Sequence, residues 1–143
     1  MRAARRVRET TQVTFQGGFA SVGVGQVDGN TASQALRATL GIRDLDSRAL
    51  GYAMVDSVEF GIVVVGARVK QLISTYRVPT GSVGIIFNMW AMEPTSRERY
   101  AQSGFDIRAA GGGSRAVQQR FNTRADWYLP SALLQAMAAG FHR

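Results

Sequence analysis

The chain has 143 residues, a length typical of one domain, and 45% of them are hydrophobic while 19% are charged. This composition excludes a disordered polymer and predicts a globular protein with a buried core. The sequence has no cysteine, and His142 is the only histidine. Thiol catalysis, cysteine-ligated zinc, a histidine triad and a multi-histidine metal site are therefore excluded, together with most histidine-based acid–base mechanisms. We expect no catalytic residue, no metal, no cofactor and no enzymatic activity.

The charge is positive and unevenly distributed, with 17 Lys and Arg against 10 Asp and Glu and Lys70 as the only lysine. Residues 1–8 contain four arginines and no acid, and residues 97–124 contain six arginines and two acids. Guanidinium groups bind phosphate through two parallel hydrogen bonds, so the clusters predict a nucleic-acid partner. A GC-rich genome would explain the scarcity of lysine, but it does not explain the clustering.

The N-terminal cluster predicts a flexible basic arm over residues 1–10. So many charges with almost no apolar surface favour a solvated tail that neutralises phosphates without reading sequence. A basic terminus without function is the alternative. The arginines expected to bind nucleic acid here are Arg2, Arg5, Arg6 and Arg8.

Strand signals dominate the segments that follow the arm. Residues 12–26 combine apolar side chains with several glycines, which is typical of a bent or bulged strand. A short helix beginning at Thr31 or Ser33 is expected to end at Leu40, before Gly41. Residues 52–65 are rich in β-branched side chains and predict the strongest strand.

Two more long strands are expected, over 68–78 and 83–92, joined by a turn at 78–81. The second strand is apolar on both faces, so one face requires cover from a helix or a neighbouring subunit. Trp90 is the candidate anchor of such an interface. Residues 105–109 predict a short strand, and residues 131–141 predict a helix.

A second basic stretch, interleaved with aromatic residues, lies between the last strand and that helix. Arginine with aromatic rings is the combination that holds single-stranded nucleic acid, because bases stack while phosphates pair with guanidinium groups. The alternative is a solvated edge whose aromatic rings belong to the core. The residues concerned are Arg108, Arg115, Arg120 and Arg124 with Phe121, Trp127 and Tyr128.

These elements predict a single, mainly β, antiparallel domain over residues 11–143 with one or two short helices. The stretch FDIRAAGGGSRAVQQRFNTRADWYLPSALL, residues 105–134, resembles coat proteins of small spherical viruses, in particular the jelly-roll capsid proteins of satellite plant viruses. The resemblance lies in the Phe-Asp-x-Arg-Ala opening, in Asn122-Thr123-Arg124-Ala125 and in the aromatic-x-Pro-x-x-Leu close. It implies a jelly-roll-like β-sandwich or barrel, although the helix expected over 131–141 departs from a family that would finish in strands.

The leading hypothesis is a viral capsid protein that self-assembles into a shell and packages single-stranded nucleic acid, with RNA as the expected form. Its location would be the virion, assembled in the host cytoplasm, and no membrane partner is expected. Two alternatives stay open: a small single-stranded nucleic-acid-binding β-barrel, and a bacteriophage tail or head-completion protein. The size of the particle in solution would separate the capsid protein from the small β-barrel. Co-purified nucleic acid would count against the bacteriophage tail or head-completion protein.

Overall fold

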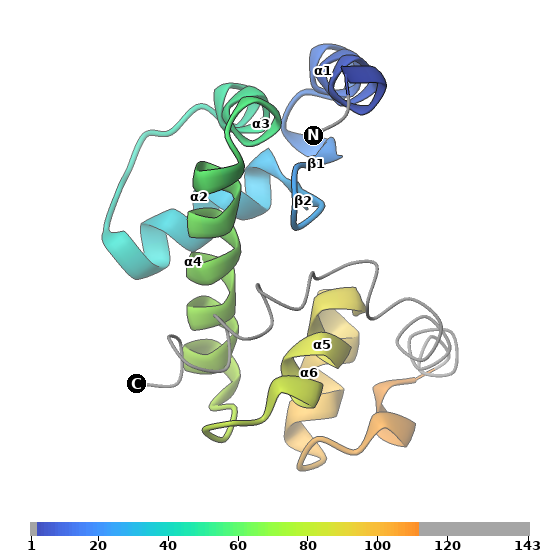
Figure 1. Ribbon diagram of the computed structural model, residues 1–143. Coiled ribbons are helices and arrows are strands. Elements are labelled where there is room, and N and C mark those ends of the chain that lie inside the picture. The colour runs from blue at the N-terminus through green and yellow to red at the C-terminus, as the bar shows by residue number, and fades with distance from the viewer. Residues whose placement is uncertain (1–2, 112–143) are drawn as a thin grey trace. The chain divides into compact units, whose positions relative to one another are not determined.

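The computed structural model describes residues 3–111, and 73% of these residues are helical. The chain divides into two compact units, Met1–Gln71 and Leu72–Arg143. The expected jelly-roll-like β-sandwich or barrel is wrong, because the described residues contain six α-helices and one sheet of two short antiparallel strands (Figure 1).

The first unit consists of helices around a small hairpin (Figure 1). Ser21 pairs with Asp28 and Val22 pairs with Val27 across the two antiparallel strands. In chain order the elements are α1 (Ala3–Gln16), the 3-10 helix η1 (Gly17–Phe19), β1 (Ser21–Val22), β2 (Val27–Asp28), α2 (Gly29–Leu40), α3 (Ser47–Asp56) and α4 (Val58–Tyr76), which continues past Gln71. Residues 3–10, expected in a flexible arm, therefore belong to a helix.

Side-chain caps explain where three of these helices begin. The Asp28 carboxylate accepts the backbone N–H of Thr31 at 2.7 Å at the start of α2. Asp46 caps α3 in the same way. Before α4, the Ser57 hydroxyl oxygen accepts the N–H of Phe60 at 3.1 Å. Each cap satisfies a backbone donor that would otherwise lack a partner inside the helix.

The two strands expected over 52–65 and 68–78 are wrong, because these residues form the end of α3 and nearly all of α4. Val65, Val69 and Leu72 are buried and lie on one face of a helix at intervals of four and three residues. A dense run of apolar β-branched residues does not distinguish a strand from a buried helix. The Ser57 cap and the 19-residue length of α4 are the signals that favour the helix.

The expected helix end at Leu40 is confirmed, but the expected start is wrong, because α2 begins at Gly29 with Asp28, and not Thr31 or Ser33, as its cap. Gly41 follows Leu40 with a φ of 69°, the left-handed conformation that ends many helices, and its N–H donates to the carbonyl of Arg37 at 3.1 Å. The turn expected at 78–81 is also present, with Ser82 N–H donating to the carbonyl of Pro79 at 3.2 Å.

The described part of the second unit contains the end of α4, then α5 (Val83–Ala91), α6 (Pro94–Gln102) and the 3-10 helix η2 (Ile107–Ala110). The strands expected over 83–92 and 105–109 are wrong, since α5 and η2 occupy these positions. Ile86 and Met89 are buried three residues apart, as one face of a helix requires. The helix expected over 131–141 lies outside the described residues.

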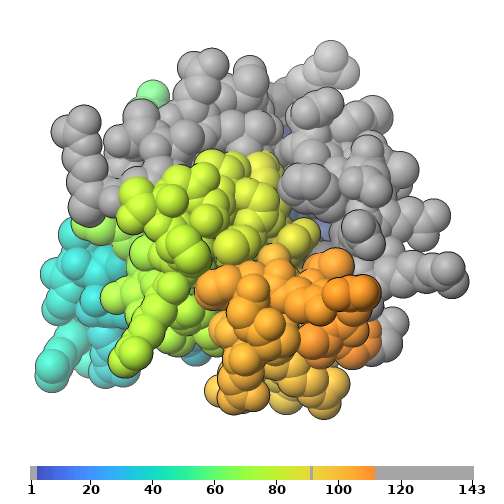
Figure 2. Space-filling view, turned by 90° about the horizontal axis from the view of Figure 1, so that it is seen from below, coloured from blue at the N-terminus to red at the C-terminus, as the bar shows by residue number. Residues whose placement is uncertain are grey.

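Hydrogen bonds and ring contacts hold α5, α6 and the segment after α6 together. The Asn88 side-chain amide donates to the hydroxyl of Tyr100 at 2.9 Å, and Arg97 Nε donates to the carbonyl of Met89 at 2.7 Å. The buried ring of Tyr100 contacts the Phe105 ring edge-on, with centroids 5.6 Å apart. In Figure 2 the orange surface of η2 lies against the surface of α6.

Glycines bring the helices of the first unit into very close contact. A Cβ atom added at Gly29 would lie 1.9 Å from the backbone oxygen of Ser47, so α2 and α3 touch through their backbones. A Cβ at Gly18 would lie 2.7 Å from the Cβ of Ser47, and one at Gly51 would lie 3.1 Å from the methyl groups of Val13. These positions have no room for a larger residue.

We predict that Gly29→Ala lowers the free energy of unfolding by about 3 kcal/mol, because the added methyl forces α2 and α3 apart. The matched control is Gly84→Ala in α5, where nothing lies within 4 Å of the added Cβ. The control should raise stability by up to about 1 kcal/mol through helix propensity. Urea titrations followed by far-ultraviolet circular dichroism measure both, and equal midpoints would contradict the close contact.

Candidate nucleic-acid interface

A buried carboxylate fixes the rotation of α1 about its own axis. Glu9 is 1% exposed, and its Oε1 accepts hydrogen bonds from Arg5 Nε at 2.9 Å and from the Gln26 amide at 3.0 Å. Its Oε2 accepts the backbone N–H of Gly23 at 3.1 Å. Since Gly23 and Gln26 belong to the loop between β1 and β2, this network binds one face of α1 to the hairpin.

A second face of α1, roughly 100° around the helix axis from Glu9, is left in water. Arg8 and Phe15 are seven residues apart, which places them on the same side of the helix two turns from each other. Phe15 is 82% exposed, and Phe19, at the end of η1, is 81% exposed. Aromatic side chains are usually buried, so two rings this exposed within five residues indicate a surface that contacts something else.

A second arginine reaches this region from α3. Arg48 is exposed, and a Cβ added at Gly17 would lie 3.4 Å from its Nη2 atom and 3.6 Å from its Nε. Gly17 stands between Phe15 and Phe19, so the guanidinium lies beside the backbone that joins the two exposed rings. We refer to Arg8, Phe15, Phe19 and Arg48 as the α1–η1 surface.

The α1–η1 surface offers two kinds of interaction. No ion pair within residues 3–111 involves Arg8 or Arg48, so both guanidinium groups can bind an anion. The phenylalanine rings can stack on flat apolar groups, but they offer no donor or acceptor that would distinguish one base from another. Guanidinium groups and exposed aromatic rings on one surface are the combination used in sequence-tolerant binding to single-stranded nucleic acid.

The arginines expected in the arm have different surroundings in the structure. Arg5 donates to Glu9 and, through Nη2, to the carbonyl of Gly23 at 3.0 Å. Arg6 pairs with Asp56 of α3 through Nε at 3.1 Å and Nη2 at 2.7 Å. Of the expected arginines that the structure describes in α1, Arg8 is thus the one without an ion pair. Arg2 lies outside the described residues.

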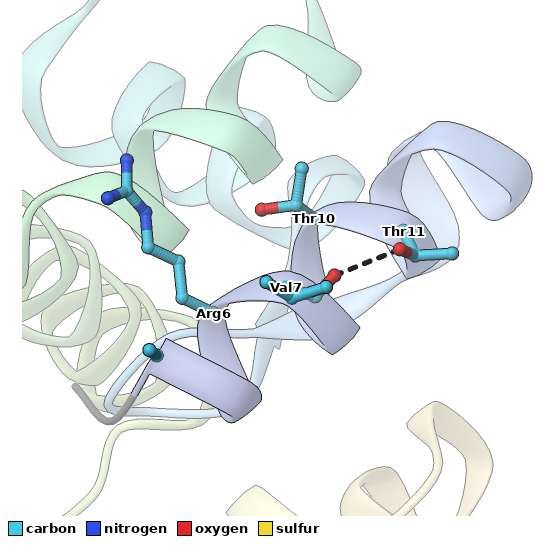
Figure 3. A pocket seen from close by; sticks show the side chains of 5 residues that line it. Arg6, Val7, Thr10 and Thr11 are labelled. Carbon is cyan, nitrogen blue, oxygen red and sulfur yellow. Dashed lines mark hydrogen bonds between the residues drawn. The ribbon is translucent and has the colours of Figure 1, made fainter.

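Arg6 also borders a hollow of about 500 Å³ on the surface of α1 (Figure 3). Its other lining residues are Ala3, Val7, Thr10 and Thr11. The Thr11 hydroxyl donates to the carbonyl of Val7 at 2.9 Å. The hollow is open to solvent, and Arg6, Thr10 and Thr11 are its polar lining residues.

The second predicted basic stretch is described only at its beginning. Arg108 donates to both carboxylate oxygens of Asp106 at 3.1 Å, and these hydrogen bonds lower the pKa of Asp106. Trp90, the expected interface anchor, is half-buried in α5. The remaining predicted residues, Arg115, Arg120, Phe121, Arg124, Trp127 and Tyr128, lie outside the described part of the chain.

Sequence reasoning missed both exposed phenylalanines and Arg48. Phe15 and Phe19 were expected to lie in a bulged strand, and that prediction did not indicate that their rings are exposed to solvent. The seven-residue spacing of Arg8 and Phe15, together with the four-residue spacing of Arg5 and Glu9, is the helical signal that would have found the exposed face. Nothing in the sequence brings Arg48 to Gly17, because that contact depends on tertiary packing.

Within residues 3–111, no group of three or more His, Cys, Asp or Glu side chains is placed to hold a metal ion. None of the helices described is both long and apolar enough to cross a lipid bilayer. No family model, curated protein or solved structure matches the chain.

We predict that Glu9→Ala lowers the free energy of unfolding by about 3 kcal/mol, because it leaves the buried N–H of Gly23 without an acceptor and removes one of the two acceptors of the Gln26 amide. Arg8→Ala, one residue away but exposed, should change stability by less than about 0.5 kcal/mol. Guanidinium chloride denaturation of the two variants is the comparison. A Glu9→Ala protein as stable as Arg8→Ala would show that the network does not hold α1 in place.

Proposed function

We propose that this protein is a non-catalytic, sequence-independent binder of single-stranded nucleic acid and that the α1–η1 surface is its contact. The observation that carries the proposal is the pair of exposed rings, Phe15 and Phe19, with the guanidinium of Arg48 beside the backbone between them. Arg8, on the Phe15 face of α1, supplies a second cation. The net charge of +7 favours a polyanionic partner for the whole chain.

The two parts of the surface have different roles in this proposal. Arg8 and Arg48 pair with phosphates and release counterions, which gives affinity that falls as salt concentration rises. Phe15 and Phe19 stack on unpaired bases, and each stacked base contributes about 1–3 kcal/mol. A duplex keeps its bases stacked on each other, so the phenylalanines favour single strands over double strands.

Variants of the aromatic and charged residues should therefore affect different measurable quantities. We predict that Phe15→Ala and Phe19→Ala each weaken binding of oligo(dT) or oligo(rU) by about 1–3 kcal/mol without changing its salt dependence. Arg8→Gln and Arg48→Gln should each reduce the slope of log K against log salt by about 0.7. Fluorescence anisotropy at several salt concentrations measures both quantities, and the two homopolymers compare DNA with RNA.

The control variants for this experiment lie at the other end of α2. Leu40→Ala removes another exposed apolar side chain, and Arg43→Gln removes another exposed arginine. The 12 residues of α2 place Leu40 roughly 16 Å along the helix axis from Gly29, which lies near η1. The proposal is contradicted if these controls weaken binding as much as the variants of the α1–η1 surface do.

A self-assembling coat that packages nucleic acid is a second candidate function. The observation that favours it is a stripe of exposed aliphatic side chains, Val58, Ile62 and Val63, on the first turns of α4. Exposed apolar stripes of this kind are covered when copies of a protein associate. In this candidate the nucleic-acid contact described above is repeated in every copy of the shell.

The coat candidate predicts particles much larger than the 15.5 kDa chain in sedimentation velocity experiments. Val63→Lys should reduce them to small species, because it places a charge in the stripe while a pair with Glu59, four residues earlier, supports the helix. Leu40→Lys, at an exposed apolar position on α2, should leave assembly unchanged. A wild-type protein that sediments as a monomer at all concentrations would eliminate this candidate and leave the binding function.

A further inference from the structure

We propose that Arg6 is an additional phosphate-binding position on α1, and that Asp56 occupies it until a phosphate group displaces the carboxylate. The inference rests on the proposed function for its natural ligand, a single-stranded nucleic acid. It adds a site on α1 outside the α1–η1 surface, and it assigns a regulatory role to Asp56 of α3.

The geometry of the ion pair makes it easy to replace. Both hydrogen bonds from Arg6 end on the same oxygen, Oδ1 of Asp56, at 3.1 and 2.7 Å. A guanidinium group binds an anion best through two parallel hydrogen bonds to two oxygens, which a phosphate offers and this carboxylate does not use. The two side chains are 61% and 56% exposed, so water and salt already weaken their attraction.

The hollow in Figure 3 gives the incoming phosphate a place to bind. Arg6 and Thr10, four residues and about one helical turn apart on α1, both line it. No hydrogen bond among the residues described here uses the Thr10 hydroxyl, which can therefore donate to a phosphate oxygen. The neighbouring Thr11 hydroxyl differs, because it already donates to the carbonyl of Val7.

Arg5 shows why this role falls to Arg6. The partner of Arg5 is the buried carboxylate of Glu9, and breaking that pair would leave a buried charge with one partner fewer. The partner of Arg6 is exposed and returns to water when it is displaced. Arg6 and Arg8 also flank the exposed Val7, so a strand that crosses α1 at Val7 has a cation on each side.

The experiment compares Asp56→Asn with Asp44→Asn. Both variants remove one negative charge, but Asp44 is an exposed loop residue outside the ion pairs of the described chain. Its φ of 59° is one that asparagine tolerates well, so the control should fold normally. The ligands are tripolyphosphate, which has phosphates and no bases, and oligo(dT).

Asp56→Asn should bind tripolyphosphate roughly two- to fivefold more tightly than the wild type, which is the effect of removing an exposed competing partner. With oligo(dT), the slope of log K against log salt should steepen by up to about 0.7, one phosphate contact. Asp44→Asn should leave the slope unchanged. Arg6→Gln should weaken binding by itself, and in combination with Asp56→Asn it should abolish the gain.

Equal effects of Asp56→Asn and Asp44→Asn would overturn the inference, because general charge would then explain both. A gain that persists in the Arg6→Gln background would overturn it as well. The ligands separate this inference from the proposed function. Tighter tripolyphosphate binding by Asp56→Asn, with oligo(dT) binding insensitive to Phe15→Ala, would support the Arg6 site and contradict the stacking surface. If Asp56→Asn does not tighten tripolyphosphate binding but Phe15→Ala weakens oligo(dT) binding, the stacking surface is supported and the Arg6 site is contradicted.

Discussion

The carboxylate of Glu9 is the constraint on which the exposed surface of this protein depends. A buried charge is tolerated only where several donors surround it, and Glu9 has three, from Arg5, Gly23 and Gln26. Gly23 and Gln26 have φ angles of 76° and 48°, so the loop adopts left-handed backbone where it meets the carboxylate. With one face of α1 fixed in this way, the helical repeat places Arg8, one residue before Glu9, about 100° around the axis and in solvent.

Close backbone packing between the helices of the first unit is the second constraint that positions the α1–η1 surface. Gly51 admits the Val13 side chain of α1 onto α3, and Gly29 lets the backbone of α2 contact that of Ser47. These contacts bring the first turn of α3 against η1, which is why Arg48 reaches Gly17 from 31 residues away in sequence. The chemistry of the site comes from arginine and phenylalanine, but its geometry comes from glycines with no chemistry of their own.

Local signals in the sequence were sufficient where a single residue type decides the conformation. Gly41 ends α2 as expected because few other residues adopt its left-handed backbone. The helical structure of residues 52–65 and 83–92 could not be predicted in the same way, because a continuous apolar run fits a strand and a buried helix equally well. The site was harder still: no local pattern shows that Arg5 serves a buried carboxylate whose other donors lie 14 and 17 residues further along the chain.

Arg5, Arg6 and Arg8 of α1 show that the net charge of a protein does not predict how many of its arginines can contact phosphates. Arg5 belongs to the fold, Arg6 is held by an exposed carboxylate, and Arg8 is unpaired within the described chain. Each successive residue turns by about 100° around the helix, so three identical side chains meet a buried acid, an exposed acid and water. Although the chain carries +7, the proposed α1–η1 contact would use only Arg8 and Arg48, which corresponds to a salt slope of about −1.4 on the single-strand scale. The proposed displacement of Asp56 from Arg6 would bring that slope to about −2.1, so a long polyanion would gain a contact that general attraction to the protein does not supply.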